Sequence, residues 1–197
     1  MQTTTKKRSK AMNKKRCFWV TKDQIYIDYH DNEWGKPVYD DQTLFEFIIL
    51  ESFQAGLSWL TILKRREQFR MAFDQFEVQK VAQYSTEKVE ELIQNEGIIR
   101  HRGKIEAAIS NAKLFIEIQN EFGSFAQFIW NYVDHQPIIN HWTTREEVPA
   151  TTPLSDLIAK DLKKRGFKFF GSTTIYAFMQ GIGMVNDHTT DCFCYKG

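Results

Sequence analysis

The chain has 197 residues and a formal net charge of +1, which fits one globular domain of ordinary size. It is rich in aromatic residues (16 Phe, 7 Tyr and 5 Trp), and its 10 Gly and 4 Pro are too few for an all-β fold with many turns. Charges interrupt every apolar run before it reaches the length of a membrane span, and the N-terminus lacks the apolar core of a signal peptide. We therefore expect a cytoplasmic protein with no membrane partner.

Charge is distributed unevenly along the chain. Residues 1–16 hold seven of the 26 basic residues and no acidic residue, so the remainder is acidic overall. A protein that coats nucleic acid through its general charge would be basic throughout. The sequence predicts a disordered basic tail over residues 1–13 and one folded domain over residues 14–197, with any nucleic-acid contact confined to local patches.

Helix-start signals, each followed by apolar residues at helical spacing, recur along the chain. The helix after Thr152-Pro153 also has an end signal, because three bases precede Gly166. No alternation typical of strands competes with this pattern. The sequence predicts an all-α domain of about eight helices, which begin near Thr21, Asp40 or Asp41, Ser58, Ser85 or Thr86, Gly103, Ser124, Thr152 and Ser172.

An acidic residue, Glu51, closes the apolar run 44–50, which is typical of a buried helix. A buried carboxylate is costly unless it has a partner. Aromatic residues follow it, and no obvious cation stands at helical spacing. Such a carboxylate suits a flat, electron-poor ligand that donates hydrogen bonds, as a damaged cationic nucleobase does. The alternative is a helix-end carboxylate that faces water or pairs with Arg65 or Arg66.

Two cysteines and two histidines at opposite ends of the chain form a candidate metal-binding set. A Cys2His2 set suits four-coordinate zinc, and full protein ligation would make one such zinc structural. The alternatives are that these are ordinary buried residues, or that Cys194 supplies the fourth ligand. Three cysteines do not make a disulfide framework. The set consists of Cys17, His30, His188 and Cys192.

A glycine-bearing connection over residues 96–104 lies between two helical patterns. A hairpin of this kind can present backbone amides to a phosphate, and Arg100, Arg102 and Lys104 would add positive charge there. The helix-hairpin-helix pattern has glycine where this chain has Ile99. On this segment alone, a solvated helix connection is the alternative.

Several longer motifs occur in a fixed order along residues 14–197. In that order they resemble the DNA-3-methyladenine glycosylase I family, bacterial base-excision repair enzymes of the helix-hairpin-helix superfamily. The motifs are Cys17-Phe18-Trp19, Tyr29-His30-Asp31-Asn32-Glu33-Trp34-Gly35, Glu51 with Gln54-Ala55-Gly56-Leu57-Ser58-Trp59, Gly97-Ile98-Ile99-Arg100-His101-Arg102, Lys164-Arg165-Gly166-Phe167-Lys168-Phe169 and Asn186-Asp187-His188.

The resemblance implies an all-α helix-hairpin-helix fold in which a zinc ion, bound by the four residues above and not by Cys194, joins the two termini. It implies a monomeric enzyme that hydrolyses the N-glycosidic bond of 3-methyladenine in double-stranded alkylated DNA and leaves an abasic site. Glu51 becomes the candidate catalytic residue and recognises the base. The implied base pocket comprises Trp19, Tyr26, Tyr29, Glu51 and Trp59, and the implied DNA contacts are Gly56, Leu57, Arg100, Arg102 and Lys104.

Two other functions remain open from the residues. One is a non-catalytic, zinc-stapled module that binds damaged DNA. The other is a glycosylase that also cleaves the strand, for which Lys104 is the nearest candidate amine. Many glycosylases of this fold use an aspartate downstream of the hairpin, and none occurs between Lys104 and Val133. That absence favours a monofunctional enzyme acting on a base whose glycosidic bond is already weak.

Overall fold

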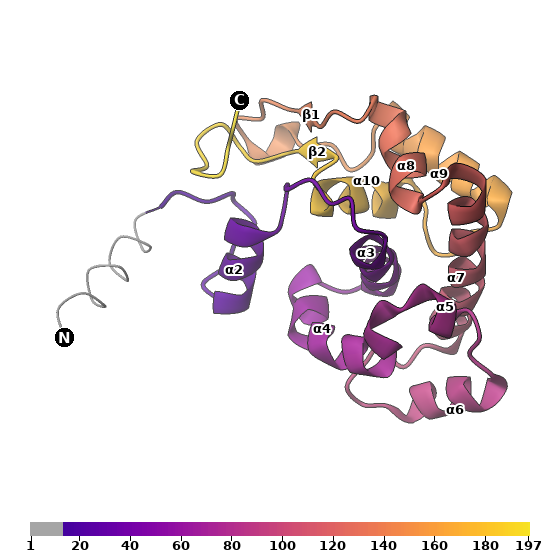
Figure 1. Cartoon of the computed structure of the whole chain (residues 1–197). Coiled ribbons are helices and arrows are strands. Elements are labelled where there is room, and N and C mark those ends of the chain that lie inside the picture. Colours follow the sequence, from indigo (N-terminus) through magenta and orange to yellow (C-terminus); the bar gives the residue numbers. More distant parts are fainter. Residues whose placement is uncertain (1–13) are drawn as a thin grey trace, which may run out of the picture.

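The computed structural model describes residues 14–197, and the predicted basic tail over residues 1–13 lies outside them. The described chain forms a mostly helical domain, which confirms the predicted fold class (Figure 1). No helix in this range is both long and apolar enough to cross a membrane. The α-helices are α2 (Gln24–Asn32), α3 (Asp41–Gln54), α4 (Trp59–Ala72), α5 (Val78–Val81), α6 (Thr86–Gln94), α7 (Arg102–Phe122), α8 (Phe125–Trp130), α9 (Pro153–Arg165) and α10 (Ser172–Gly181).

Side-chain caps explain where most of these helices begin. In six of them the residue before the helix accepts a hydrogen bond from the backbone N–H three residues later, which satisfies a donor that the first turn leaves free. Two starts differ from the prediction. The first helix begins at Gln24, and α7 begins before Gly103, because the His101 ring accepts from the backbone N–H of Lys104. The six caps are Asp40, Ser58, Ser85, His101, Ser124 and Thr152.

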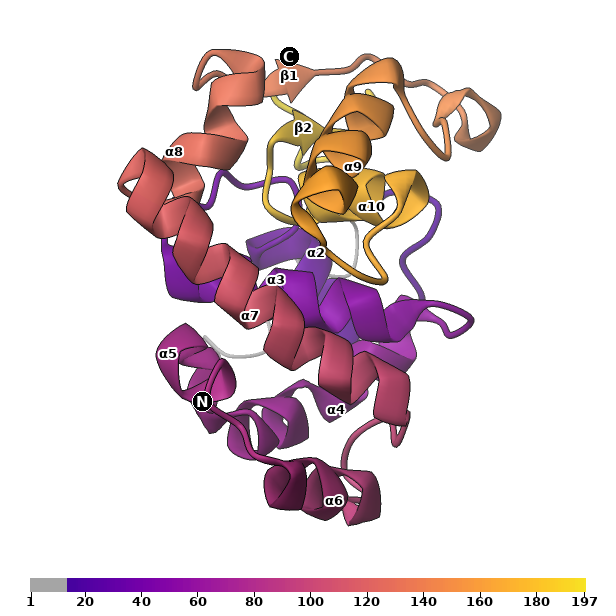
Figure 2. The ribbon, with the colours of Figure 1, turned by 90° about the vertical axis from the view of Figure 1, so that its right-hand side faces the viewer.

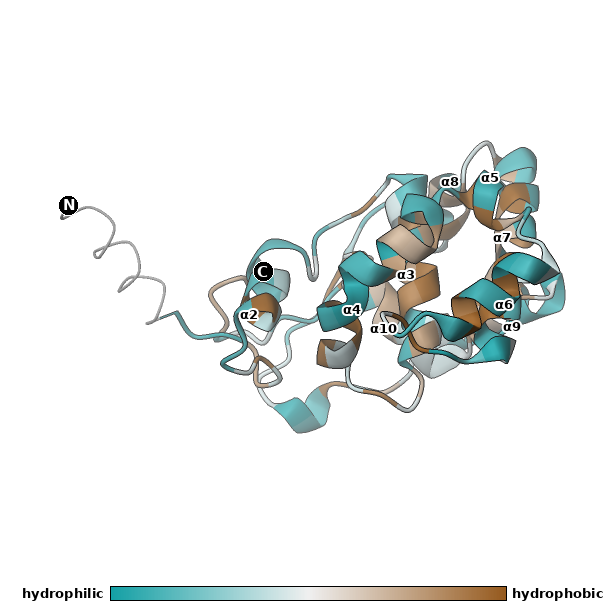
Figure 3. Cartoon of the chain, turned by 90° about the horizontal axis from the view of Figure 1, so that it is seen from below, coloured by the Kyte–Doolittle hydropathy of each residue, from teal (hydrophilic) through white to brown (hydrophobic). Residues whose placement is uncertain are grey.

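Helix α3 forms the centre of the domain, and every residue from Leu44 to Phe53 is buried. It packs against α4, α7, α8 and α10, and Figure 2 shows the long α7 crossing it. Figure 3 colours most of α3 as hydrophobic, whereas α6 carries both hydrophilic and hydrophobic residues. A helix apolar on all sides lies in the middle of a core, so the end of α3 delivers Glu51 into the interior.

The structure adds two short strands that the sequence analysis did not predict. Strand β1 (Ile138–Ile139) pairs in parallel with β2 (Val185–Asn186), in the register Ile138 to Val185 and Ile139 to Asn186. Two residues per strand are too few to show alternation. The two ends of the described chain also meet, since the Phe193 amide donates to the Lys15 carbonyl at 2.9 Å.

Candidate active site and metal cluster

A cavity of about 310 Å³ opens beside α2, the end of α3, the start of α4 and α10. Its size lies at the lower end of the range of small-molecule sites. Residues 148–150 of the connection before α9 close one side. The walls include all five residues expected to form the base pocket, namely Trp19, Tyr26, Tyr29, Glu51 and Trp59.

Glu51 reaches this cavity from the last turn of α3 and is only 4% exposed. Burial raises the pKa of its carboxyl group to about 8. Its Oε2 atom is buried and has no hydrogen-bond partner within residues 14–197. The pairing with Arg66 weighed from the sequence does not form, because that guanidinium bonds Glu46 and Glu33, each at 2.5 Å. A buried polar atom without a partner requires an explanation, and a ligand in this cavity would provide one.

Aromatic rings surround the Glu51 carboxyl group. The Tyr29 and Trp59 ring centroids lie 5.6 Å apart, and those of Trp19 and Tyr26 lie 4.9 Å apart. The Trp59 indole N–H is buried and has no acceptor in the described chain. The pKa of Tyr29 lies well above its usual value, chiefly because the phenol is buried and secondly because the Glu51 carboxylate is near, so the phenol stays protonated. The cavity therefore combines flat apolar walls with an unused carboxyl group and an unused N–H.

Asp187 is a cavity residue that was not predicted from the sequence. Asp187 lines the cavity, is 2% exposed and accepts hydrogen bonds from four side chains. Both of its oxygens are therefore used within the protein, and its role is to join α10 to the connection after β1. Its place in the Asn186-Asp187-His188 motif was the only sequence signal. The four donors are Asn140, Trp142, Tyr176 and Gln180, at 2.6 to 2.8 Å.

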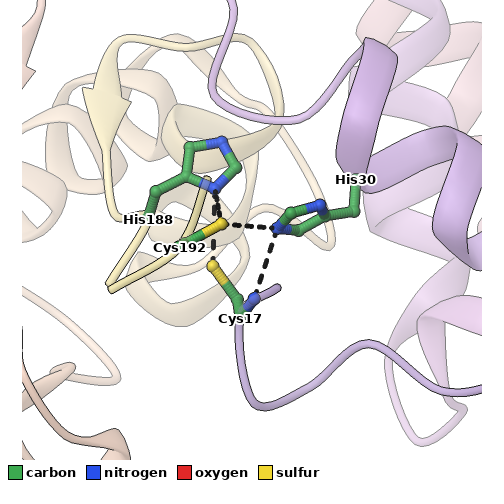
Figure 4. A group of neighbouring side chains, drawn as sticks. All are labelled: Cys17, His30, His188 and Cys192. Carbon is green, nitrogen blue, oxygen red and sulfur yellow. Dashed lines mark hydrogen bonds between the residues drawn. The ribbon is translucent and has the colours of Figure 1, made fainter. Parts of the chain in front are cut away.

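The four predicted metal ligands lie together and are all buried, although they come from opposite ends of the chain (Figure 4). Their ligand atoms lie within 4.8 Å of one another. Sulfur to nitrogen separations are 3.4 Å for Cys17 to His188, 3.4 Å for Cys192 to His30 and 3.5 Å for Cys192 to His188. Tetrahedral zinc bonded to sulfur and nitrogen would separate them by about 3.6 Å. The cluster could therefore hold a metal ion.

The surroundings of the two histidines also suit a metal. His30 directs Nε2 towards the sulfurs while its Nδ1 lies 2.9 Å from the Asp31 carboxylate, and His188 directs Nε2 to the Trp34 carbonyl at 3.2 Å. In metal sites the second ring nitrogen usually donates to a carboxylate or carbonyl in this way. The hydrogen bond from Cys17 lowers the pKa of Cys192, which favours the thiolate that metals bind.

The cluster and the cavity share a wall. The Trp19 ring centroid lies 5.2 Å from that of His30, and the Trp34 ring lies 4.7 Å from that of His188. Tyr29 and His30 are consecutive on α2, so one helix turn supplies both sites. A metal in the cluster would therefore fix the positions of the pocket aromatics.

The hairpin residues fall into two groups. Arg100 and Arg102 are exposed and make ion pairs with glutamates, including one from Arg102 to Glu90 at 2.8 Å. Lys104 is buried, and its ammonium donates to the carbonyls of Phe53 and Ala55, each at 3.1 Å. The structure thus gives Lys104 a backbone partner in place of the phosphate expected from the sequence.

A tight turn connects α3 to α4. The Leu57 amide donates to the Gln54 carbonyl at 2.7 Å, Ala55 has φ −47° and ψ 118°, and Gly56 has φ +83°. These values define a type II turn, whose third residue needs a positive φ and is therefore usually glycine. Leu57, the last residue of the turn, is 39% exposed. The turn thus presents an apolar side chain beside the cavity residues Gln54 and Trp59.

Comparison with known proteins agrees with this arrangement. A family model described as methyladenine glycosylase matches residues 19–195. The DNA-3-methyladenine glycosylase 1 of Escherichia coli strain K12 is 53% identical over 182 residues, covering 92% of this chain and 97% of that protein. The DNA-3-methyladenine glycosylase of Haemophilus influenzae is 51% identical over 179 residues, covering 91% of this chain and 97% of that protein.

Solved structures show the same fold. A crystal structure of 3-methyladenine DNA glycosylase I matches with a TM-score of 0.90 and 54% identity, covering 92% of this chain and all of that one. The Staphylococcus aureus enzyme, in a structure that describes its recognition of 3-methyladenine, matches with a TM-score of 0.89 and 38% identity, covering 92% of this chain and 97% of that one. These matches confirm the resemblance found in the sequence, and the chain belongs to the methyladenine glycosylase family of DNA repair enzymes.

Proposed function

We propose that this glycosylase hydrolyses the N-glycosidic bond of 3-methyladenine in double-stranded alkylated DNA, releasing the free base and leaving an abasic site. The names of the curated relatives support this activity. The observation that carries it is the unpartnered Glu51 carboxyl group in an aromatic cavity of about 310 Å³. A non-catalytic module that recognises only distorted duplex, without taking up a base, would not need such a group.

Glu51 selects the methylated base through its charge. N3-methylation makes adenine cationic and turns its exocyclic amine into a better hydrogen-bond donor. In the empty pocket Glu51 keeps its proton at pH 7, because burial raises its pKa to about 8. Entry of a cation favours the carboxylate, so Glu51 releases that proton to water and accepts from the amine. Normal adenine brings no charge to offset the cost of ionising the buried group.

The aromatic walls add to this selectivity. A cation against the face of Trp59 or Tyr29 gains about 2 kcal/mol when both are desolvated. Stacking on aromatic side chains also returns about 1–3 kcal/mol per base, which offsets the cost of removing the base from the duplex. The unpaired Trp59 N–H is a further donor that the base can use.

The chemical step needs little acid or base assistance. The positive ring leaves as neutral 3-methyladenine, water adds to the sugar carbon, and the water's proton goes to solvent. This agrees with the lack of an aspartate between Lys104 and Val133. It also fits a monofunctional enzyme, because the Lys104 ammonium is held by two backbone carbonyls and is not free to attack the sugar.

The Gln54–Leu57 turn and the 96–104 hairpin would bind the duplex. Leu57, the exposed last residue of the Gln54–Leu57 turn, would fill the gap that the extruded base leaves. Arg100 and Arg102 would bind the backbone phosphates. Their present ion pairs with glutamates are exposed and therefore weak, so phosphate can replace them.

We further propose that the metal is one structural zinc ion per chain. Cys17, His30, His188 and Cys192 would hold it, and the chemistry of two thiolates and two imidazoles fits zinc. Bound zinc would supply a rigid link between the chain ends and take no part in bond cleavage, since all four positions are filled by protein.

One experiment separates the candidate functions. Methylated duplex DNA is incubated with the full-length protein, and free bases are separated by chromatography. Release of 3-methyladenine with no borohydride-trapped adduct supports the monofunctional glycosylase. A trapped adduct would show strand-cleaving chemistry, and a DNA complex without base release would show a damage-binding module.

A further inference from the structure

Lys104 occupies a position that its own helix disfavours. It lies in the first turn of α7 and is only 6% exposed. Burial removes water from the ammonium group and lowers the pKa of Lys104. The partial positive charge at the start of a helix also opposes a cation there. A residue that conflicts with its local surroundings often serves a function elsewhere, so the partners of Lys104 indicate its role.

The partners of the Lys104 ammonium are backbone carbonyls at the C-terminal end of α3. The Nζ atom is 3.1 Å from the carbonyl oxygens of both Phe53 and Ala55. The last carbonyls of a helix lack intrahelical donors and carry a partial negative charge. Lys104 thus caps α3 from a different helix, 51 residues after Phe53 and 49 after Ala55 in the chain.

The bond to Ala55 also controls the turn that follows. The Ala55 carbonyl belongs to the central peptide of the Gln54–Leu57 turn, and the orientation of that peptide distinguishes a type II turn from a type I turn. Gly56, with φ +83° here, can adopt the positive φ of a type II turn or the negative φ of a type I turn, because glycine has no Cβ. The Lys104 ammonium therefore holds the type II form and, with it, the direction of Leu57.

We propose that Lys104 is a positioning residue that holds the Gln54–Leu57 turn in the conformation that enters the duplex. The inference rests on the proposed function, since the turn matters only when a base leaves a duplex. Lys104 is the last residue of the 96–104 hairpin, so its side chain joins the hairpin that is expected to bind the phosphates to the turn that is expected to fill the gap in the duplex. The hairpin and the turn then meet the DNA as one rigid unit.

The test compares Lys104→Met with Lys113→Met. Methionine has a similar length but no donor, and Lys113 is an exposed lysine on the same helix that serves as the matched control. One readout is the single-turnover rate of 3-methyladenine release from methylated duplex DNA with enzyme in excess. The other is the affinity for free 3-methyladenine, followed by tryptophan fluorescence.

We expect Lys104→Met to slow release from duplex DNA by about tenfold or more while free-base affinity changes less than about twofold, because only the turn is misplaced. Lys113→Met should leave both unchanged. The rate losses of Lys104→Met and Leu57→Ala should not multiply in the double variant, since both act through one turn. If Lys104→Met does not fold, Lys104→Gln, whose shorter side chain cannot reach both carbonyls, takes its place.

Three results would overturn the inference while leaving the proposed function intact: an unchanged release rate in Lys104→Met, an equal loss of free-base affinity, or fully multiplicative losses with Leu57→Ala. Failure of the wild-type protein to release any base would instead overturn the proposed function, and the inference with it.

Discussion

Replacing Glu51 by glutamine should make the free protein more stable at neutral pH. In the folded wild type the carboxyl group holds its proton up to about pH 8, whereas its usual pKa is 4.5. Between these values the folded state binds more protons than the unfolded state. The free energy of unfolding contributed by this group therefore falls as pH rises through that window and is constant below it. Glutamine does not titrate, so the variant lacks this loss.

The size of the effect follows from the two pKa values. Between the two pKa values, each pH unit lowers the free energy of unfolding of the wild type by about 1.4 kcal/mol. At pH 7 the wild type has therefore lost about 3 kcal/mol of stability through this group. Urea unfolding of both proteins at pH 5, 6, 7 and 8 measures it. The metal ligands and other groups titrate in both proteins, and their contributions cancel in the difference. The difference in free energy of unfolding between Glu51→Gln and the wild type should be smallest at pH 5 and grow at each higher pH.

Parallel pH curves would refute the reasoning, because they would mean that Glu51 ionises in the folded state as it does in water. Glu117→Gln, a change at an exposed position of α7, is the control and should run parallel to the wild type. A variant that gains stability but loses base release would mark Glu51 as a residue kept for function at a cost in stability.

The other predictions concern the metal and the turn. The purified protein should contain about one zinc per chain; Cys192→Ser should lose it and Cys194→Ser should keep it, and equal metal content in the two variants would contradict the ligand assignment. Gly56→Ala should lower the free energy of unfolding by about 1–2 kcal/mol, because alanine is strained at φ +83° even where its methyl group has space. A change smaller than the error of urea unfolding would show that the turn relaxes easily.

Most of the helices could be predicted from short stretches of sequence. Polar residues such as Asp40 and Ser58 mark helix starts because their side chains bond amides only three residues away. The apolar run before Glu51 also identified the central helix, because a helix buried on all sides has no polar face. The β1–β2 pairing could not be predicted, because it joins two pairs of residues that are 47 positions apart.

The site shows the same division. The four metal ligands were recognisable because few chemistries require two cysteines and two histidines, although only the fold brings them together. The roles of Lys104 and Asp187 were not recognisable. A basic residue in a hairpin looks like a phosphate ligand until α3 is placed against it, and the four donors to Asp187 come from two separate segments, the connection after β1 and helix α10.

The most direct test of the role of Glu51 compares base release from methylated duplex DNA by the wild type, Glu51→Gln and Glu117→Gln. All three proteins are first shown to be folded and to contain equal metal. We expect release of 3-methyladenine by the wild type and by Glu117→Gln, with a large loss in Glu51→Gln. Equal release by all three would contradict the claim that the unpaired Glu51 carboxyl group recognises the cationic base.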